Sequence, residues 1–533
     1  MKKSKGAKNN MHTGNQLDMH GRRSKPSAEL TSLIDRGLLP EDASLAAEAP
    51  AFTDNPFQLG IASGEPHPDG FVIWTRLAPD PLAEDGSGGM PNRNVPVRWE
   101  VAEDEHFRKI VKQGTATALA ELGHSVHVEI HGLKPARYYW YRFKAGREIS
   151  RTGRTKTAPP PYVDLSGMSF SLASCQAWYH GYFTAYRHMA EDHPDVVFFL
   201  GDYIYEYPIN ENNLYRDVKL SSAHNAKTVT LSQYRLRYSL FKTDPDLQNI
   251  HALAPWVTTM DDHEVENNYA GIYSQYNPSP EAFLKQRAAA YQAFYENIPV
   301  RRASLPKGPD MLMYRRFRYG NLAEFNVLDT RQYRSNYPAN EDERLDPERS
   351  ILGKAQEQWL FRGLSRSNTI WNMLVQQVVL AQIDRDTGPG TEYSVDQWDG
   401  YPASRDRLFS AYQTCGIQNP VVLTGDIHRH AAADLKTDFN DVQSKTIGTE
   451  LIATSIASDA DGAETDSLAP IWLGNPHVKL YNAQRGYVRC TMTPKQLLAE
   501  FQVLPYVTRP GASVSTYASF LVEAGRPGLQ RIH

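Results

Sequence analysis

The chain has 533 residues, of which 41% are hydrophobic and 22% are charged, and its formal net charge is -4. This length exceeds what a single hydrophobic core organises, so we expect more than one domain. The small negative charge argues against a general nucleic-acid-binding surface and against an anionic membrane as partner, because the chain lacks the net positive charge that would attract either of them. No stretch is long and apolar enough for a transmembrane segment, and we expect a monomer.

The first 52 residues are polar and rich in lysine and turn-forming residues, which predicts a largely disordered leader. A twin arginine at positions 22–23 is followed by Ser-Lys-Pro where the apolar region of an export signal would begin, so no signal peptide is readable. The cysteines, Cys175, Cys415 and Cys490, are odd in number and widely spaced, so they imply no disulfide framework. We expect Cys415 and Cys490 to lie in the core.

Short runs of alternating apolar and polar residues, separated by turn residues, fill residues 53–157. This pattern predicts an N-terminal β-sandwich of the immunoglobulin-like or fibronectin-like type, and the last predicted strand carries a tyrosine where such sandwiches have a tyrosine corner. A proline-rich stretch at residues 158–167 predicts an extended linker that closes off this domain. The predicted strands are residues 70–76, 95–101, 125–130 and 133–143.

From residue 168 to residue 533 the sequence alternates between strand and helix patterns, which predicts a second domain of the α/β class. Its clearest buried strand is residues 195–201, in which five consecutive residues are apolar or aromatic. The other predicted strands are residues 169–173, 256–260, 324–328, 372–380 and 421–424. The predicted helices are residues 182–190, 280–295, 354–365 and 405–414.

Four of these strands end in a cluster of polar residues. Loops at the carboxyl ends of the strands of an α/β sheet line its ligand crevice, so the four clusters are expected to converge. Carboxylates directly after a buried strand are hard to explain by packing, because they are rarely buried unless paired or bound to a metal. The candidate ligands in the clusters are Cys175, Asp202, Tyr205, Asp262, Asp426 and His428.

The types of these side chains fit metal chemistry. A thiolate, a phenolate and an imidazole suit a transition metal, whereas grouped carboxylates suit a hard cation that prefers oxygen. Phosphoester cleavage needs such a centre to generate hydroxide, to neutralise the phosphoryl oxygens and to stabilise the leaving oxygen. The sequence therefore indicates a metal centre of the kind that phosphoester cleavage needs.

Several motifs carry a resemblance to a known family. Residues 201–205 match the G-D-x-x-Y element of metallophosphoesterases related to purple acid phosphatases. Residues 261–264 resemble their G-N-H-E element with Asp in place of Asn, and residues 425–428 resemble their G-H-x-H element with Asp in place of the first His. Residues 371–377 offer Gln where another His is usual. Together these departures resemble the alkaline phosphatase D (PhoD-like) family, from about residue 55 to the end.

The resemblance implies a metallophosphoesterase four-layer α/β/β/α sandwich as the catalytic domain, residues 168–533. It implies one Fe3+ ion held by Cys175, Asp202, Tyr205 and His428. It also implies two Ca2+ ions, for which Asp202, Asp262 and Asp426 supply ligands. The implied reaction is hydrolysis of a small-molecule or polymer phosphate ester, monoester or diester, by metal-activated hydroxide. An extracytoplasmic location is implied as well. His263 is the candidate acid or a phosphate-binding donor, and Asn267 is a candidate contact to a phosphoryl oxygen or a metal.

Some alternatives stay open at the level of sequence. Tyr203 and Tyr207 compete with Tyr205 as ligand, and His430 either points toward the site or ends the strand. Arg331 and Arg334 either clamp a phosphate or are solvated or ion-paired. For the function, a phospholipase D-like phosphodiesterase is the nearest alternative. A non-catalytic surface-binding protein is the alternative of a different class.

Overall fold

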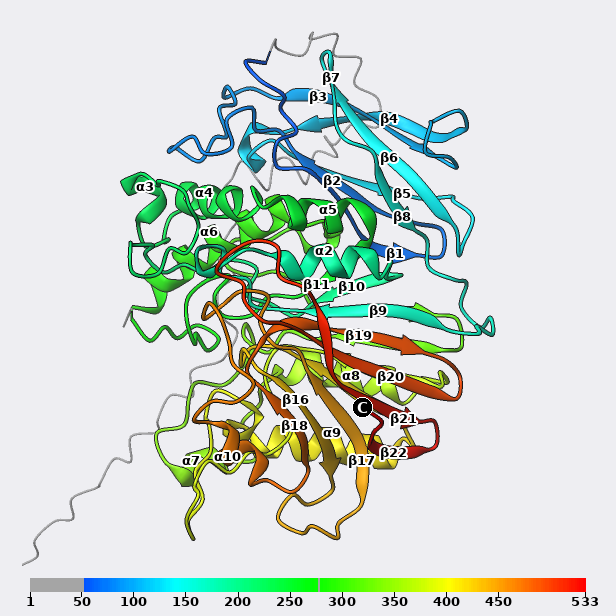
Figure 1. Cartoon of the computed structure of the whole chain (residues 1–533), viewed down its shortest axis with the longest axis vertical. Helices are drawn as coiled ribbons and strands as arrows, with labels where there is room; N and C mark the ends of the chain where they lie inside the picture. The colour runs from blue at the N-terminus through cyan, green and yellow to red at the C-terminus, as the bar shows by residue number, and fades with distance from the viewer. Residues whose placement is uncertain (1–51, 277–278) are drawn as a thin grey trace, which may run out of the picture. The chain divides into compact units, whose positions relative to one another are not determined.

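The computed structural model of the chain describes residues 52–276 and 279–533. The predicted leader therefore lies almost wholly outside the described residues and stays a prediction. Within the described residues the strands form a ten-stranded, a seven-stranded and a smaller sheet (Figure 1). In the same ranges, no helix combines the length and the hydrophobicity that a bilayer span requires.

The ten-stranded sheet has parallel strands at its centre. β10 pairs in parallel with both β9 and β11, and its four residues, Val196–Phe199, are all buried. In order, the sheet consists of β22 (Arg526–Arg531), β21 (Ser515–Glu523), β20 (Gln496–Leu504), β19 (Arg485–Met492), β9 (Met168–Ala173), β10 (Val196–Phe199), β11 (Pro255–Thr258), β1 (Ile61–His67), β2 (Gly70–Arg76) and β5 (Ser125–Ile130).

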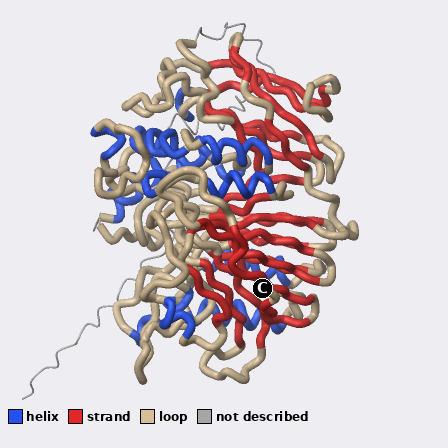
Figure 2. The backbone as a smooth tube through the Cα atoms, in the orientation of Figure 1, coloured by secondary structure: helices blue, strands red, loops and turns tan. Residues whose placement is uncertain are grey.

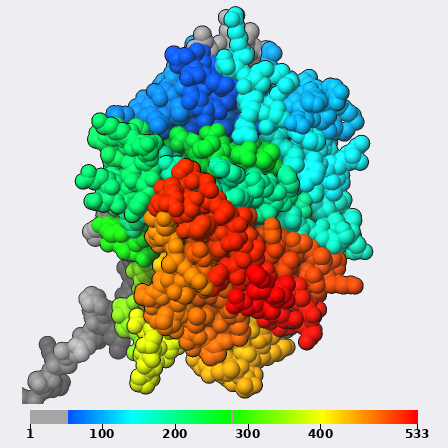
Figure 3. Space-filling view, viewed as in Figure 1, coloured from blue at the N-terminus to red at the C-terminus, as the bar shows by residue number. Residues whose placement is uncertain are grey.

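The seven-stranded sheet also has parallel strands at its centre, namely β13, β14, β15 and β17. In order it consists of β12 (Arg315–Tyr319), β13 (Ala323–Val327), β14 (Trp371–Val375), β15 (Pro420–Thr424), β17 (Thr446–Ile452), β16 (His430–Lys436) and β18 (Val478–Asn482). The C-terminal strand β22 lies against this sheet, where Leu529 donates its N–H to Asp434 on β16. Figure 3 shows this C-terminal segment in red on the visible face.

The two large sheets pack face to face through an aromatic core. The ring of Phe198 on β10 stacks on that of Phe325 on β13 with centroids 4.5 Å apart, and Phe170 on β9 meets both edge-on. Such offset and edge-on pairs stabilise a core beyond the area they bury. The carboxyl ends of parallel strands from both sheets are thereby brought near one another.

Helices cover the outer face of each sheet, in two groups that Figure 2 shows in blue. The first group packs on β9, β10 and β11 and consists of α2 (Thr184–Glu191), α4 (Leu231–Phe241), α5 (Pro245–Leu253) and α6 (Pro280–Asn297), with α3 (Ser222–Asn225) next to α4. The second packs on β14 and β15 and includes α8 (Gly353–Leu364), α9 (Pro402–Thr414) and α10 (Ala469–Leu473). The short α7 (Glu341–Arg344) precedes α8. The α/β class is confirmed.

The N-terminal strands do not form a separate pair of sheets. β1, β2 and β5 belong to the ten-stranded sheet, since β1 pairs in parallel with β11 at Ser63↔Pro255 and Gly64↔Trp256. A smaller sheet packs on them through a shared hydrophobic core. It comprises β4 (Ile110–Ala118), β3 (Val95–Ala102), β6 (Tyr138–Ala145), β7 (Glu148–Ile149) and β8 (Gly153–Lys156). In β6, the Tyr139 hydroxyl accepts the N–H of Lys134 at 3.0 Å, which is the bond of a tyrosine corner.

Candidate metal centre

The predicted ligands lie at the carboxyl ends of β9, β10, β11 and β15, on tight turns. Cys175, Asp202, Asp426 and His428 all adopt positive φ, at 57°, 60°, 66° and 56°. This left-handed region is costly for residues other than glycine, and such strain persists only where the surroundings enforce it. Four strained non-glycine residues on the converging loops mark a functional site.

The backbone of these loops is held by one buried carboxylate. Glu264 accepts N–H groups from Asp202 at 3.1 Å, from Tyr203 at 2.5 Å and from Asp261 at 2.7 Å. At Gly201, where φ is 107°, an added Cβ would lie 2.4 Å from the Cβ of Asp261, so only glycine permits this approach of the two loops. Glu264 thus fixes the ends of β10 and β11 relative to each other.

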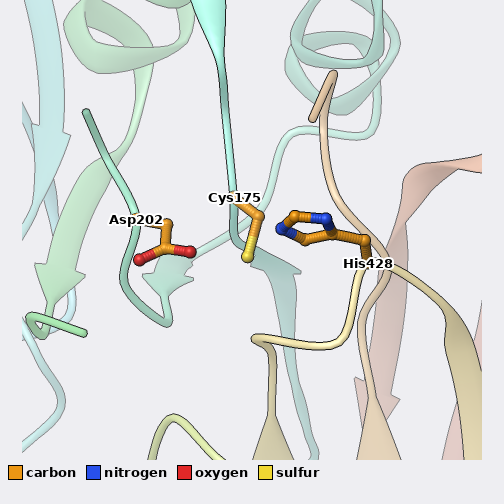
Figure 4. A group of neighbouring side chains, drawn as sticks. All are labelled: Cys175, Asp202 and His428. Carbon is orange, nitrogen blue, oxygen red and sulfur yellow. The ribbon is translucent and has the colours of Figure 1, made fainter. Parts of the chain in front are cut away.

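The structure brings Cys175, Asp202 and His428 together. Each offers a ligand atom, and these atoms lie within 4.8 Å of one another. Figure 4 shows the three side chains pointing toward one another from separate segments. The Tyr205 hydroxyl lies 3.1 Å from Oδ2 of Asp202 and 2.9 Å from Nε2 of His428. Sulfur, phenol, imidazole and carboxylate therefore surround one point.

Two further groups of ligand atoms adjoin the first. Asp202, Asp262 and His263 form one, and Asp261, Asp262 and Asp426 form the other, each within 4.8 Å. Asp202 connects the first group to the second, and Asp262 connects the second to the third. The six predicted metal-ligating residues are thus side by side. Asp261 was not among them, although it precedes Asp262 in the same motif.

Acidic side chains are crowded and buried at this centre, which opposes their ionisation. Burial raises the pKa of Asp202 and of Asp261 well above the ordinary value, and burial together with Asp202 does the same for the Cys175 thiol. The buried oxygens Asp261 Oδ2 and Asp262 Oδ1 have no hydrogen-bond partner. Buried carboxylates without sufficient partners are what bound cations would compensate. The donor set therefore fits metal ions.

His263 is positioned by three neighbours. Its Nδ1 lies 2.7 Å from Glu206 Oε2, and its ring lies between those of Tyr205 and Tyr207, with centroids 4.3 Å and 5.1 Å away. Its Nε2 lies 3.9 Å from Asp262 Oδ2 and so faces the carboxylates. Burial opposes the imidazolium, but Asp262, Glu206 and Asp202 raise the pKa of His263 well above its ordinary value. Asn267 follows closely, and its N–H donates to Glu206 at 3.0 Å.

Of the competing tyrosines, Tyr203 turns away from the centre. Its hydroxyl lies 2.9 Å from Nε2 of His251 and accepts from Lys242 at 3.0 Å. His430 also turns away, since its Nε2 lies 3.1 Å from the carbonyl of Gln502 and its Nδ1 accepts a backbone N–H. The expectation for Cys415 was wrong. It is exposed at the end of α9, because the chain leaves the helix there on the surface, whereas Cys490 is buried.

The two arginines near the centre are ion-paired rather than solvated. Arg331 is fully buried, with Nε 2.5 Å from Asp261 Oδ1, Nη1 2.6 Å from Asp396 Oδ1 and Nη2 3.3 Å from Asp426 Oδ1. Arg334 reaches the same Asp396 oxygen at 2.8 Å. Sequence reasoning missed Asp396, which lies in a loop without a motif. These bonds occupy the guanidinium group of Arg331 within the protein, whereas Nη2 of Arg334 is buried without a hydrogen-bond partner.

This fold and this group of side chains define a phosphoric ester hydrolase, as the comparisons with known proteins show. Residues 170–501 match the family described as PhoD-like phosphatase, and residues 43–159 match the N-terminal domain of the PhoD-like phosphatases. The chain belongs to the PhoD-like phosphatase family. It is therefore an enzyme, and this finding argues against the alternative interpretation of the sequence as a non-catalytic surface-binding protein.

Two relatives are similar over most of their length. The chain is 50% identical over 494 residues to alkaline phosphatase D of Bacillus subtilis (strain 168), which covers 91% of this chain and 84% of the relative. A solved structure described as the structure of PhoD has the same 50% identity and a TM-score of 0.87, covering 91% of this chain and 94% of that one.

Proposed function

We propose that the centre holds Fe3+ through Cys175, Asp202, Tyr205 and His428, and Ca2+ through Asp202, Asp262 and Asp426. The observation that carries this is the chemical division of the centre. Soft or electron-rich donors gather at Cys175 and Tyr205, whereas only oxygen donors gather at Asp261, Asp262 and Asp426. A transition metal suits the first set and a hard cation suits the second.

Bound cations would supply positive charge to the phosphoryl oxygens and acidify water at the centre. The protein supplies the proton for the leaving oxygen from Nε2 of His263. Glu206 holds the opposite nitrogen at 2.7 Å, which fixes the ring with Nε2 facing the carboxylates. Asn267, next to this pair, is proposed to donate its side-chain amide to a phosphoryl oxygen. His263 is therefore the proposed acid.

The substrates proposed are phosphomonoesters, phosphodiesters or both, with a phospholipase D-like diesterase as the alternative. Purified protein should be assayed on aryl phosphate monoesters and diesters with the same leaving group, and metals should be quantified in the same sample. Iron and calcium together with turnover of either ester support the proposal. Turnover by protein that contains neither metal would contradict the metal assignment and leave the hydrolase activity standing.

We also propose the division into an N-terminal domain at residues 53–157, a linker at 158–167 and a catalytic domain at 168–533. The separate family matches to residues 43–159 and 170–501 support these limits. The family resemblance supports an extracytoplasmic location. Fractionation of cells that express the full chain tests the location, and gel filtration tests the expected monomer.

A further inference from the structure

A cavity of about 230 Å³ lies next to the metal centre, on the side of β15. Most of its wall is apolar. Apolar side chains in a core normally pack against one another and leave few voids of this size. α10 and the residue before it contribute much of this wall. The apolar lining residues are Val379, Ile383, Ile427, Leu468, Ile471 and Trp472.

Two residues join this cavity to the centre. Gln397 lines the cavity, and its Nε2 donates to Oδ2 of Asp426 at 2.8 Å. Ile427 lines the cavity as well and stands in the chain between Asp426 and His428. The cavity therefore begins one side chain away from a proposed calcium ligand. Neither Asp426 nor His428 lines the cavity, so a group attached to a phosphate at the centre has to pass the Gln397 side chain to enter it.

The cavity is also lined by two arginines and by Asp399, whose carboxylate is already paired with Arg405 at 2.6 Å. Arg429 is already paired, with Nε 3.0 Å and Nη2 2.9 Å from Oδ2 of Asp466. Arg385 is different, because its exposed side chain has no hydrogen bond or ion pair within the described parts of the chain. An apolar cavity with one unengaged guanidinium beside it suits an organic group that is apolar with an anionic substituent.

We propose that this cavity is the subsite for an apolar organic group of the phosphate ester, of about the size of one aromatic ring. This rests on the proposed function, since it takes the adjoining centre as the place where the ester is bound. A dry apolar cavity of about 150 Å³ is known to admit benzene, so the volume is sufficient. The group is the one that stays on phosphorus. His263, the proposed acid for the leaving group, lies in the group formed with Asp202 and Asp262. The cavity instead adjoins Asp426, through Gln397, so the leaving group and the group in the cavity are different substituents of phosphorus.

The test uses diesters with a constant 4-nitrophenyl leaving group and a methyl or a phenyl group retained on phosphorus. Because the leaving group is unchanged and the intrinsic reactivities of the two esters are the same for every variant, a change in the ratio of their kcat/KM values between wild type and variant reports binding of the retained group. The wild type should prefer the phenyl ester by about 10-fold or more, the scale on which apolar pockets discriminate. Ile471→Trp, which fills the cavity, should bring this ratio toward one.

Leu473→Trp is the matched control, because Leu473 is on the same helix but 53% exposed and outside the cavity wall. It should leave the phenyl-to-methyl ratio unchanged. Ile471→Ala is a second variant, in case the tryptophan prevents folding. It enlarges the cavity and should shift the preference from phenyl toward naphthyl. Arg385→Ala should selectively weaken a carboxyphenyl ester relative to the phenyl ester.

The outcomes separate the two proposals. If the wild type hydrolyses neither diester and no aryl phosphate monoester, the proposed function fails. If it hydrolyses both diesters with equal kcat/KM, and neither variant of Ile471 changes the ratio, the subsite is wrong while the function stands. A ratio that changes equally in Leu473→Trp also overturns the subsite, because the effect would then come from α10 as a whole.

Discussion

Oδ2 of Asp459 lies 2.8 Å from Nδ1 of the His428 imidazole. A carboxylate in this position fixes the tautomer with the proton on Nδ1, so that Nε2 presents its lone pair to the centre. The same Nε2 lies 2.9 Å from the Tyr205 hydroxyl, among the other proposed ligands. Asp459 itself has positive φ, at 67°, so its backbone is also held in a strained conformation.

We expect Asp459→Ala to weaken iron binding by about 10–100-fold, the usual effect of removing such a partner of a metal-bound histidine. Retained iron after dialysis against a chelator is the measurement. Asp461→Ala is the control, since Asp461 accepts the N–H groups of Val507 and Thr508 and makes no contact with His428. Equal iron loss in both variants would show that Asp459 acts only on the loop.

Activity should require calcium as well as iron, because Asp261, Asp262 and Asp426 present only oxygen atoms to one part of the centre. A calcium-selective chelator should abolish turnover, and Ca2+ should restore it much better than Zn2+. Turnover and bound metals are measured on the same sample. Full activity in iron-loaded, calcium-free protein would rule out this assignment.

Tyr205 and Cys175 on a ferric ion should give a visible charge-transfer band, so concentrated protein should look purple or brownish. Neither Ca2+ nor Zn2+ can produce such a band, because neither has an accessible vacant d level. Tyr205→Phe should shift or bleach the band. Tyr203→Phe is the control that should leave it nearly unchanged, because its hydroxyl contacts Lys242 and His251 instead. A colourless, iron-replete and fully active wild type would contradict the ferric tyrosinate.

His263→Ala should lower kcat by roughly 10²–10⁴-fold, the scale of a general acid. The loss should be smaller for activated aryl leaving groups than for alkyl ones, since a good leaving group needs little protonation. Rates are compared across a series of leaving groups. Equal losses along the series would mean that His263 positions a ligand or binds phosphate.

Arg331→Met should destabilise the metal-free protein by about 3–5 kcal/mol, because it leaves Asp261 buried without its cation and Asp396 paired with Arg334 alone. The measurement is the denaturant midpoint. Arg187→Met serves as control, since Arg187 pairs with Asp246 at 3.1 Å on the surface and such pairs contribute about 0–1 kcal/mol. A similar small loss in both variants would argue against the buried ion-pair network.

The strands that carry the ligands were predictable because each is a short, mainly apolar run with polar residues directly after it. Residues 195–201 are the clearest case, and β10 occupies Val196–Phe199. Tyr205 was selected by its spacing from Asp202, and its hydroxyl lies 3.1 Å from that carboxylate. Local pattern was sufficient there, since strand, turn and ligand are adjacent in the chain.

Other features left no local signal. Glu206 was not predicted as the partner of His263, because an acidic residue after Tyr205 is not unusual in itself. α4 was missed because residues all round it are buried, so its sequence has no amphipathic period. The predicted strand at residues 372–380 ends at Val375, and Gln376 instead donates to the Val378 carbonyl and Thr424.

The parallel pairing of β1 with β11 makes the order of synthesis matter. β1 is synthesised well before its parallel neighbour β11, which follows α5 in the chain. The separation in sequence between β9 and its neighbour β19 is longer still. Such distant pairings slow folding, because the long loop between the two strands must close, at a cost in entropy, before the strand pairing contributes any stability. Cys175 follows β9 and His428 follows β15, so these two proposed ligands are far apart in the order of synthesis. The group of Cys175, Asp202 and His428 therefore cannot assemble, and cannot bind the proposed metal ion, before residue 428 has been synthesised.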